Sequence, residues 1–162
     1  GGQVRQVGTA RSTIGVLVVV RADGVQERLL GEGALPLYEG DILKTDTAAR
    51  ALIEILDDVQ IALNEQTTVK ILVRWEKHKP VTPIFRITRG EMWVKTTDRS
   101  RSLEVETPVA NVAASESEFD LKVDDDGQTA LAVLQGTAEF GTPFDTLGDG
   151  GQRDIKHSRE AL

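Results

Sequence analysis

The chain has 162 residues, of which 40% are hydrophobic and 28% charged, a composition typical of one folded domain with its own core. It has no Cys, which excludes disulfides, thiolate metal sites and a Cys nucleophile. The formal net charge is −7. Because nucleic-acid binding depends on Lys and Arg neutralising phosphates, this charge argues against a nucleic-acid partner.

Neither a membrane span nor a targeting signal stands out. The longest apolar run, Ile14–Val20, has seven residues, whereas a membrane-spanning helix needs about 20. The sequence opens with two glycines instead of Met, so we expect residues 1–2 to be a cloning remnant or the start of a fragment. We expect a single β domain over residues 3–155 and a tail or linker over 156–162.

The first predicted elements form a hairpin. Val16–Val20 is a run of apolar, mostly β-branched residues, and Val25–Leu30 follows it after a short polar break. The break contains Asp23-Gly24, and both residue types tolerate the positive φ that a type I′ turn requires. The pattern therefore predicts two antiparallel strands joined at this turn.

The next pair of strands has the clearest alternation. Side chains 51, 53 and 55 share one face of the run Ala51–Leu56, and side chains 59, 61 and 63 share one face of Val59–Leu63. Asp57-Asp58 separates the two runs and provides a turn. Since successive side chains of a strand point to opposite faces, the two runs can bury these six residues together.

The rest of the chain continues in the same manner, with a further turn at Asp124–Gly127. No window shows an apolar repeat at helical spacing over three turns, and the only helix candidate is the short polar segment Asp154–Leu162. We therefore predict an all-β fold of antiparallel strands, in a twisted sandwich or a short solenoid-like β-stack, with little or no helix. The remaining predicted strands are Thr67–Trp75, Ile84–Ile87, Met92–Val94, Leu103–Thr107, Val109–Ala114, Phe119–Val123, Thr129–Leu134 and Ala138–Phe140.

Two segments resemble each other weakly. Ile87–Val94 and Val133–Phe140 each hold a glycine, Gly90 or Gly136, between two apolar stretches. A glycine in such a place is typical of a strand that turns a corner, as in a sandwich, an open barrel or a short solenoid.

These segments also carry the order of motifs of a known family, and the chain resembles the FecR domain over nearly its whole length. Where that family usually has Gly-Thr before the position of Phe119, this chain has Ser115–Glu118, a departure at the expected bend of that strand. The matching motifs, in order, are Leu37–Thr45, Ala51–Leu63, Thr67–Ile71, Thr88–Val94, Val105–Val112, Phe119–Leu121, Val133–Ala138 and Leu147–Gln152.

The resemblance implies a small extracytoplasmic β domain, periplasmic or at the cell surface. In the regulators that give the family its name, such a domain receives a signal from an outer-membrane transporter and passes it through a membrane helix to a sigma factor. Other FecR-like domains belong to cell-wall, surface or secreted proteins. The resemblance thus predicts the fold more firmly than the signalling role.

The residues offer no constellation for catalysis, for a metal or for a cofactor. The two His residues, His78 and His157, stand far apart in polar stretches, and no hydrolase, metalloprotease or phosphate-loop motif occurs. Asp124–Asp126 could suggest calcium, but position twelve of such a loop is Gln135 where an EF-hand requires Glu. We predict a protein that is not an enzyme and that has no catalytic residue, metal or cofactor.

Charge is distributed unevenly, and this suggests a partner-binding surface. The stretch Lys70–Arg101 holds nine basic and three acidic residues and both Trp residues, whereas the segment after it is strongly acidic. A basic, aromatic patch could bind an acidic partner or an anionic polymer. Alternatively, basic strands could pair with acidic strands and cancel the patch. The candidate residues are Arg74, Trp75, Lys77, Lys79, Arg86, Arg89, Trp93 and Lys95.

We therefore expect a non-catalytic extracytoplasmic module of a larger envelope, surface or signalling protein, whose partner is another protein of the cell envelope. The alternative is a carbohydrate- or anionic-polymer-binding domain of a secreted or cell-surface protein. The loop between Trp75 and Pro83 is the longest polar interruption and the expected projection.

Overall fold

The computed structural model describes residues 5–99, 101–142 and 153–156, the last four as backbone alone. The described residues form strands and turns without a helix, so the predicted all-β class is confirmed. The strands are β1 (Gln6–Ile14), β2 (Val16–Val20), β3 (Gln26–Leu30), β4 (Leu35–Tyr38), β5 (Ile42–Thr45), β6 (Arg50–Ile55), β7 (Val59–Leu63), β8 (Thr68–Arg74), β9 (Thr82–Thr96), β10 (Leu103–Glu106), β11 (Asn111–Val123), β12 (Thr129–Gly141) and β13 (Arg153–Lys156). Apart from Lys156, the expected tail lies outside the described residues.

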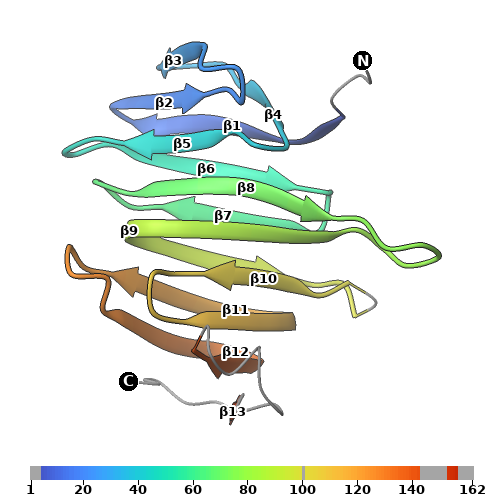
Figure 1. Ribbon diagram of the computed structural model, residues 1–162. Coiled ribbons are helices and arrows are strands. Elements are labelled where there is room, and N and C mark those ends of the chain that lie inside the picture. The colour runs from blue at the N-terminus through green and yellow to red at the C-terminus, as the bar shows by residue number, and fades with distance from the viewer. Residues whose placement is uncertain (1–4, 100, 143–152, 157–162) are drawn as a thin grey trace.

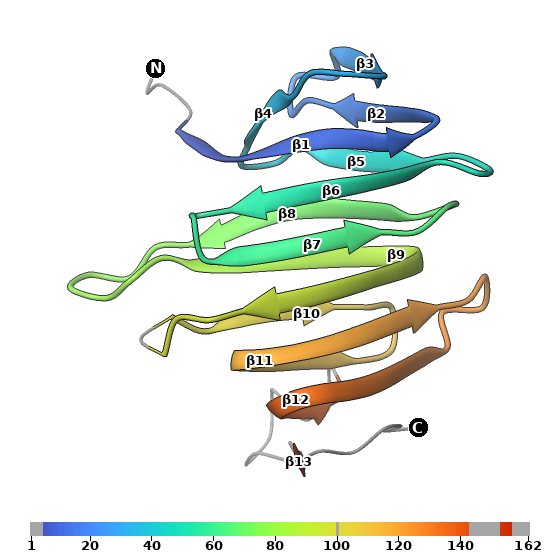
Figure 2. The same ribbon diagram turned by 180° about the vertical axis from the view of Figure 1, so that it is seen from behind.

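All these strands belong to one continuous sheet that folds over on itself, so that two halves face each other around the core (Figure 1). The front half consists of β3, β2, β5, β8, the first part of β9, β10, the first part of β11, the last part of β12, and β13. The back half, which faces the viewer in Figure 2, consists of β4, β1, β6, β7, the last parts of β9 and β11, and the first part of β12. Neighbouring strands are antiparallel except for β9 and β10, which are parallel.

Three long strands pass from one half to the other at a sharp bend. β9 crosses at Gly90, which has φ +106°, and β12 crosses at Gly136, which has φ +78°. A Cβ atom at position 90 would lie 2.2 Å from Oγ1 of Thr67, so only Gly fits there. The prediction that glycines mark corners is confirmed at both positions.

β11 makes its crossing without a glycine. Its register with β12 shifts between Ser115 and Phe119, and Glu116 adopts a left-handed backbone with φ +48°. Such a conformation costs a residue with a side chain about 1–2 kcal/mol. The bend is therefore kept in the segment where the chain departs from the usual family motif.

The two Asp-Gly hairpins occur where predicted, but their turns are not of type I′. Gly24 has φ +90° while Asp23 has a negative φ, and the amide of Gly24 donates to the carbonyl of Arg21 over 2.9 Å. The turn Asp124–Gly127 repeats this arrangement. Each is a four-residue turn of type I character with a left-handed glycine at its end, a loop that also suits the twist of a hairpin.

The core lies between the two halves and is mainly apolar. The six predicted side chains of β6 and β7 (51, 53, 55, 59, 61 and 63) are all buried, as are Phe119, Leu121 and Val123 of β11. Phe85 and Phe119 are among the largest fully buried side chains. Burying each such side chain contributes roughly 1.5–3 kcal/mol, which the ordering of the chain largely offsets.

The two ends of the folded sheet differ. At one end, β12 runs through both halves and joins them. At the other end, shown at the top of Figure 1, β3 is the edge of the front half and β4 is the edge of the back half; among the described strands, β3 pairs only with β2 and β4 only with β1. Leu29 and Leu35 lie there half-buried against the core. We call this the open end.

Candidate functional site

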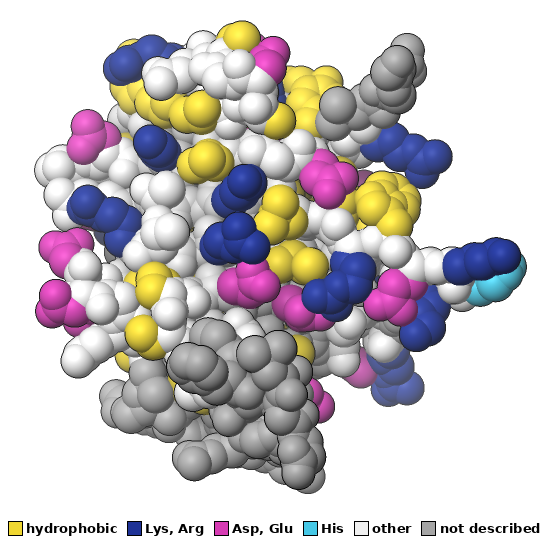
Figure 3. Space-filling view, in the orientation of Figure 1, with side chains coloured by type: hydrophobic (Ala, Val, Ile, Leu, Met, Phe, Trp, Pro, Cys, Tyr) yellow, Lys and Arg dark blue, Asp and Glu magenta, His cyan; other side chains and the backbone are white. Residues whose placement is uncertain are grey.

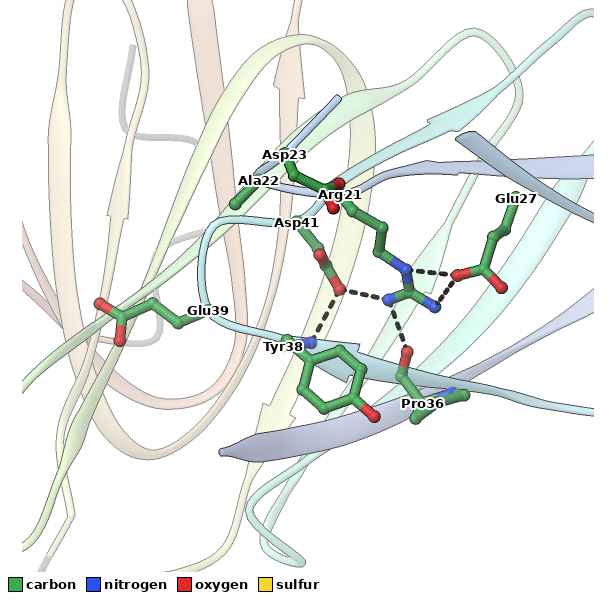
Figure 4. Close-up of a pocket in the computed structure, with 8 residues that line it drawn as sticks. All are labelled: Arg21, Ala22, Asp23, Glu27, Pro36, Tyr38, Glu39 and Asp41. Atoms are coloured by element: carbon green, nitrogen blue, oxygen red, sulfur yellow. Dashed lines mark hydrogen bonds and ion pairs between the residues drawn. The ribbon is translucent and has the colours of Figure 1, made fainter. Parts of the chain in front are cut away.

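A hollow of about 680 Å³ lies at the open end, between the β2–β3 turn and the last residues of β4 (Figure 4). We call it the mouth. Its walls are partly apolar and partly ionic, because they combine an aromatic ring and a proline with several charged groups. The lining residues are Arg21, Ala22, Asp23, Glu27, Pro36, Tyr38, Glu39 and Asp41.

Arg21 is the central group of the mouth. It follows β2 and contacts β3, β4 and the turn before β5. Its Nε donates to Oε2 of Glu27 over 2.5 Å, and its Nη1 donates to Oδ2 of Asp41 over 2.6 Å and to the carbonyl of Pro36 over 2.7 Å. Its guanidinium carbon lies 5.4 Å from the centre of the Tyr38 ring, a cation–π contact. Burial opposes the charge of Arg21, but the hydrogen bonds with Glu27 and Asp41 outweigh it and raise the pKa of Arg21.

Asp41 forms the base of this network. The residue is 1% exposed, and its Oδ2 also accepts a hydrogen bond from the backbone amide of Tyr38 over 2.7 Å. The second oxygen, Oδ1, is buried and has no hydrogen-bond partner in the described part of the chain. Because removing one partner of a buried ion pair leaves the other without compensation for its lost water, the two residues depend on each other.

The formal charge of the mouth is negative. Four carboxylates line it, those of Asp23, Glu27, Glu39 and Asp41, against the single guanidinium of Arg21. Because Arg21 is already engaged by two of these carboxylates and a carbonyl, it has little capacity left for an incoming anion. The mouth therefore favours a cationic group.

The eight residues singled out by the sequence do not gather in one place. Arg74 and Arg86 lie on the outer side of the front half, where Arg74 pairs with Glu104 and Arg86 pairs with Glu106 over 3.1 Å. Figure 3 shows basic and acidic side chains side by side on this face. These pairs are the cross-strand alternative that the sequence left open, and exposed pairs of this kind contribute only about 0–1 kcal/mol.

Three other candidates lie around the β8–β9 connection. Trp75 is 51% exposed, and the guanidinium of Arg5 lies 5.2 Å from the centre of its ring. Lys77 and Lys79 are exposed in the same loop, where Lys79 pairs with Glu76 over 3.0 Å. The loop projects from the front half in Figure 1, in agreement with the expected projection.

The last three candidates lie elsewhere. Arg89, at the bend of β9, donates to the carbonyl of Gln66 over 3.3 Å. Trp93 and Lys95 belong to the back half, between β7 and β11. Nε1 of Trp93 donates to Oε2 of Glu118 over 2.8 Å, and the ring lines a shallow hollow of about 170 Å³ with Leu52, which is 43% exposed.

Beside Trp93 lies a pair of carboxyl groups that share a hydrogen bond, those of Glu91 and Asp120. Burial, together with the hydrogen bond and the charge of Glu91, raises the pKa of Asp120 to about 7. The hydrogen bond with Asp120 lowers the pKa of Glu91, which also accepts from Asn64 over 2.9 Å and lies 4.0 Å from Nζ of Lys122. Between about pH 4.5 and 7 the pair therefore binds a proton that two separate carboxyl groups would have lost.

Sequence reasoning missed the mouth and this carboxyl pair. Asp41 lies in a quoted motif, but a motif does not say that the residue is buried against Arg21, 20 positions earlier. Glu91 and Asp120 meet through the pairing of β9 with β11, which the sequence does not specify. Within the described ranges, no three His, Asp or Glu side chains converge in a way that could hold a metal ion.

Comparison with known proteins agrees with this architecture. No curated protein matches the sequence. One solved structure with a similar fold is that of a candidate anti-sigma factor from Parabacteroides distasonis, with a TM-score of 0.55, 16% sequence identity and coverage of 71% of this chain. The match covers 50% of that protein, so this chain spans only half of its length.

The described residues contain no helix that is long and apolar enough to cross a membrane. The family model described as "FecR protein" matches residues 41–139, which is more than half of the chain and includes every strand from β5 to β11 and most of β12. The chain belongs to the FecR family.

Proposed function

We propose that this chain is a non-catalytic, extracytoplasmic protein-binding module of a larger signalling regulator, and that it binds another envelope protein through its open end. Membership of the FecR family and the shared fold with a candidate anti-sigma factor support a regulator-like domain. The observation that carries the binding proposal is the outer edge of β3 beside the mouth, which no other described strand covers.

The edge of β3 is suited to strand addition. An edge strand presents unpaired amide and carbonyl groups, and an extended peptide can pair with them. β3 carries no proline, and Val25, just before it, and Leu30, its last residue, are 54% and 70% exposed. Its Glu27 points inward to Arg21 instead of repelling a neighbour at the edge.

The other edge strand at the open end is less suited. β4 has four residues and contains Pro36, which has no amide hydrogen to donate to an added strand. A partner that adds a strand at this end is therefore directed to β3.

Site-specific photocrosslinking in the whole parent protein, in the native cell envelope, tests the proposal. A crosslinking residue replaces Leu30 at the edge of β3, and the control replaces Leu134, an apolar residue that is 55% exposed on β12. We expect one envelope protein to be crosslinked from position 30 and not from position 134. Equal crosslinking from both positions, or none from position 30, contradicts binding at the open end.

The compartment needs its own test. Protease added to intact cells with a permeabilised outer envelope is expected to cleave an epitope tag inserted in the exposed loop 76–80. If the tag is cut only after the inner membrane is lysed, the domain is not extracytoplasmic.

A second candidate, binding of a glycan, has one supporting observation. Trp93 and Leu52 border a hollow whose rim also has polar groups, among them Thr9 and Gln60, and an aromatic wall with polar neighbours suits a sugar ring. Titration of envelope glycan fragments, followed by Trp fluorescence in the parent and in Trp93→Phe, tests it; unchanged spectra at saturating glycan reject it.

A further inference from the structure

We infer that the segment pairing with β3 carries a Lys or Arg side chain that enters the mouth, and an apolar side chain two residues away from it. This inference rests on the proposed function, because it specifies the partner of the same open end.

The first argument is the direction of the side chains of β3. Glu27 pairs with Val19 and Leu29 pairs with Leu17, and both partners on β2 are fully buried. Directly opposite residues of paired strands point to the same side of a sheet. Glu27 and Leu29 therefore point inward, and an added strand places the residues opposite them on this inner side as well.

The position opposite Glu27 faces the mouth. Glu27 lines the mouth and binds Arg21, and Figure 4 shows Glu39 and Asp23 on other walls of the same hollow. The bonds of Arg21 occupy one oxygen of Glu27 and one of Asp41, while Oδ1 of Asp41, on a side chain that is 1% exposed, has no partner in the described chain. An ammonium or guanidinium group supplies the donors and the positive charge that this arrangement lacks.

The walls suit the stem of such a side chain. Ala22, Pro36 and Tyr38 contribute apolar surface between the carboxylates. Lys and Arg place their methylene stems along apolar surface while the charged head reaches polar partners. A free metal cation would gain nothing from these apolar walls. The combination of carboxylates and apolar surface therefore favours a basic side chain.

The position opposite Leu29 faces the exposed border of the core. Leu29 and Leu35, from the two edge strands, are only partly buried there. An apolar side chain from the added strand covers them and gains the free energy of removing that surface from water. The partner segment therefore reads apolar-x-basic if it runs antiparallel to β3 and basic-x-apolar if it runs parallel.

Two synthetic nine-residue peptides test this pattern on the 162-residue chain. One is a Thr-rich strand with Val-Thr-Lys at its centre, and the other has Val-Thr-Gln. We expect chemical shift changes at the amides of Gln26–Leu30 with both peptides, and about tenfold tighter binding of the Lys peptide, as for one charge-assisted hydrogen bond.

Two double variants with equal loss of charge provide the comparison. Asp23→Asn/Glu39→Gln removes two of the four carboxylates of the mouth and is expected to abolish the preference for the Lys peptide, while Asp125→Asn/Asp126→Asn, in the exposed β11–β12 turn, is expected to keep it. Circular dichroism checks that both variants are folded.

The outcomes separate the two proposals. Equal binding of the two peptides at β3 overturns the inference and leaves strand addition standing. A preference lost equally in both variants means general attraction to an acidic protein, and it overturns the inference. Two further peptides, with Lys-Thr-Val and Gln-Thr-Val at the centre, allow for a partner strand that runs parallel to β3. If none of the four peptides changes the amide chemical shifts of Gln26–Leu30, binding at β3 itself is overturned.

Discussion

The folded sheet ends differently at the two ends of this domain. At the end formed by β11 and β12, which we call the closed end, these two long strands pass through both halves and bury large side chains such as Phe119 and Leu131. At the open end, short strands stop at two edges, and a salt-bridge network around Arg21 replaces apolar packing. The family match starts at Asp41, so β1–β4, which build most of the open end, precede it.

The difference separates a region built of long crossing strands from the edge at which we propose that a partner binds. Long crossing strands bury large side chains and leave few groups for a partner, whereas an ionic, half-covered edge gives up packing and keeps groups available for binding. Substitutions in the crossing strands are therefore expected to lower the free energy of unfolding more than substitutions at the open end.

The largest effect is expected at the bend of β9. Gly90→Ala places a Cβ atom against Thr67 and forces a left-handed backbone on Ala, so we expect the free energy of unfolding to fall by at least about 3 kcal/mol. Urea unfolding followed by circular dichroism measures it. Gly31→Ala, at the open end, has φ +81° but no atom within 4 Å of its Cβ, and should cost only about 1 kcal/mol. Equal losses would mean that the close approach to Thr67 does not matter.

The next effect is expected at the base of the mouth. Asp41→Ala leaves the buried guanidinium of Arg21 with Glu27 as its only carboxylate, and we expect a loss of about 3 kcal/mol in the same unfolding assay. The control is Glu104→Ala, which breaks the exposed pair with Arg74 and should cost less than about 1 kcal/mol. A small loss for Asp41→Ala would show that the open end does not need its ion pair.

A pH-dependent effect is expected on the back half. The pKa of Asp120 is about 7 in the folded chain against an ordinary value of 3.8, so between these values the folded state binds more protons than the unfolded state. The contribution of Asp120 to the free energy of unfolding is therefore lost as the pH rises from about 4 through 7.

Asp120→Asn should remove this contribution. We expect the variant to be more stable than the parent at pH 8 and similar to it at pH 4, while the lowered pKa of Glu91 acts below this range. Urea unfolding at a series of pH values measures the slope, and Asp126→Asn, in an exposed turn, is the control that should leave it unchanged. Parallel profiles for Asp120→Asn and the parent would show that the two carboxyl groups do not share a proton.

The smallest effect is expected at the bend of β11. Glu116→Gly relieves the left-handed strain of φ +48° and loses only an exposed pair with Arg99, so stability should stay equal or rise by up to about 1 kcal/mol. Ser115→Gly, one residue earlier and without positive φ, should instead cost about 0.5–1 kcal/mol. A loss in both variants would mean that the bend does not strain Glu116.

The sequence predicted what local periodicity controls. Alternation in β6 and β7 correctly identified six buried residues, and Gly90 and Gly136 correctly marked corners. It could not predict contacts that depend on long-range pairing. The basic stretch was continuous along the chain, but β9 carries Arg86 to the front half and Trp93 to the back half, because the strand bends between them. The predicted turn type, I′, was also wrong, because the preference of Asp-Gly for positive φ does not determine the length of the loop.

The crossing strands have a consequence for how such a domain could report that its open end is occupied. Since β9, β11 and β12 each contribute hydrogen bonds to both layers, the layers cannot slide or separate where these strands run without breaking a continuous strand. If a partner binds β3 as proposed, we therefore expect the part of the domain that these strands join to move as one stiff body.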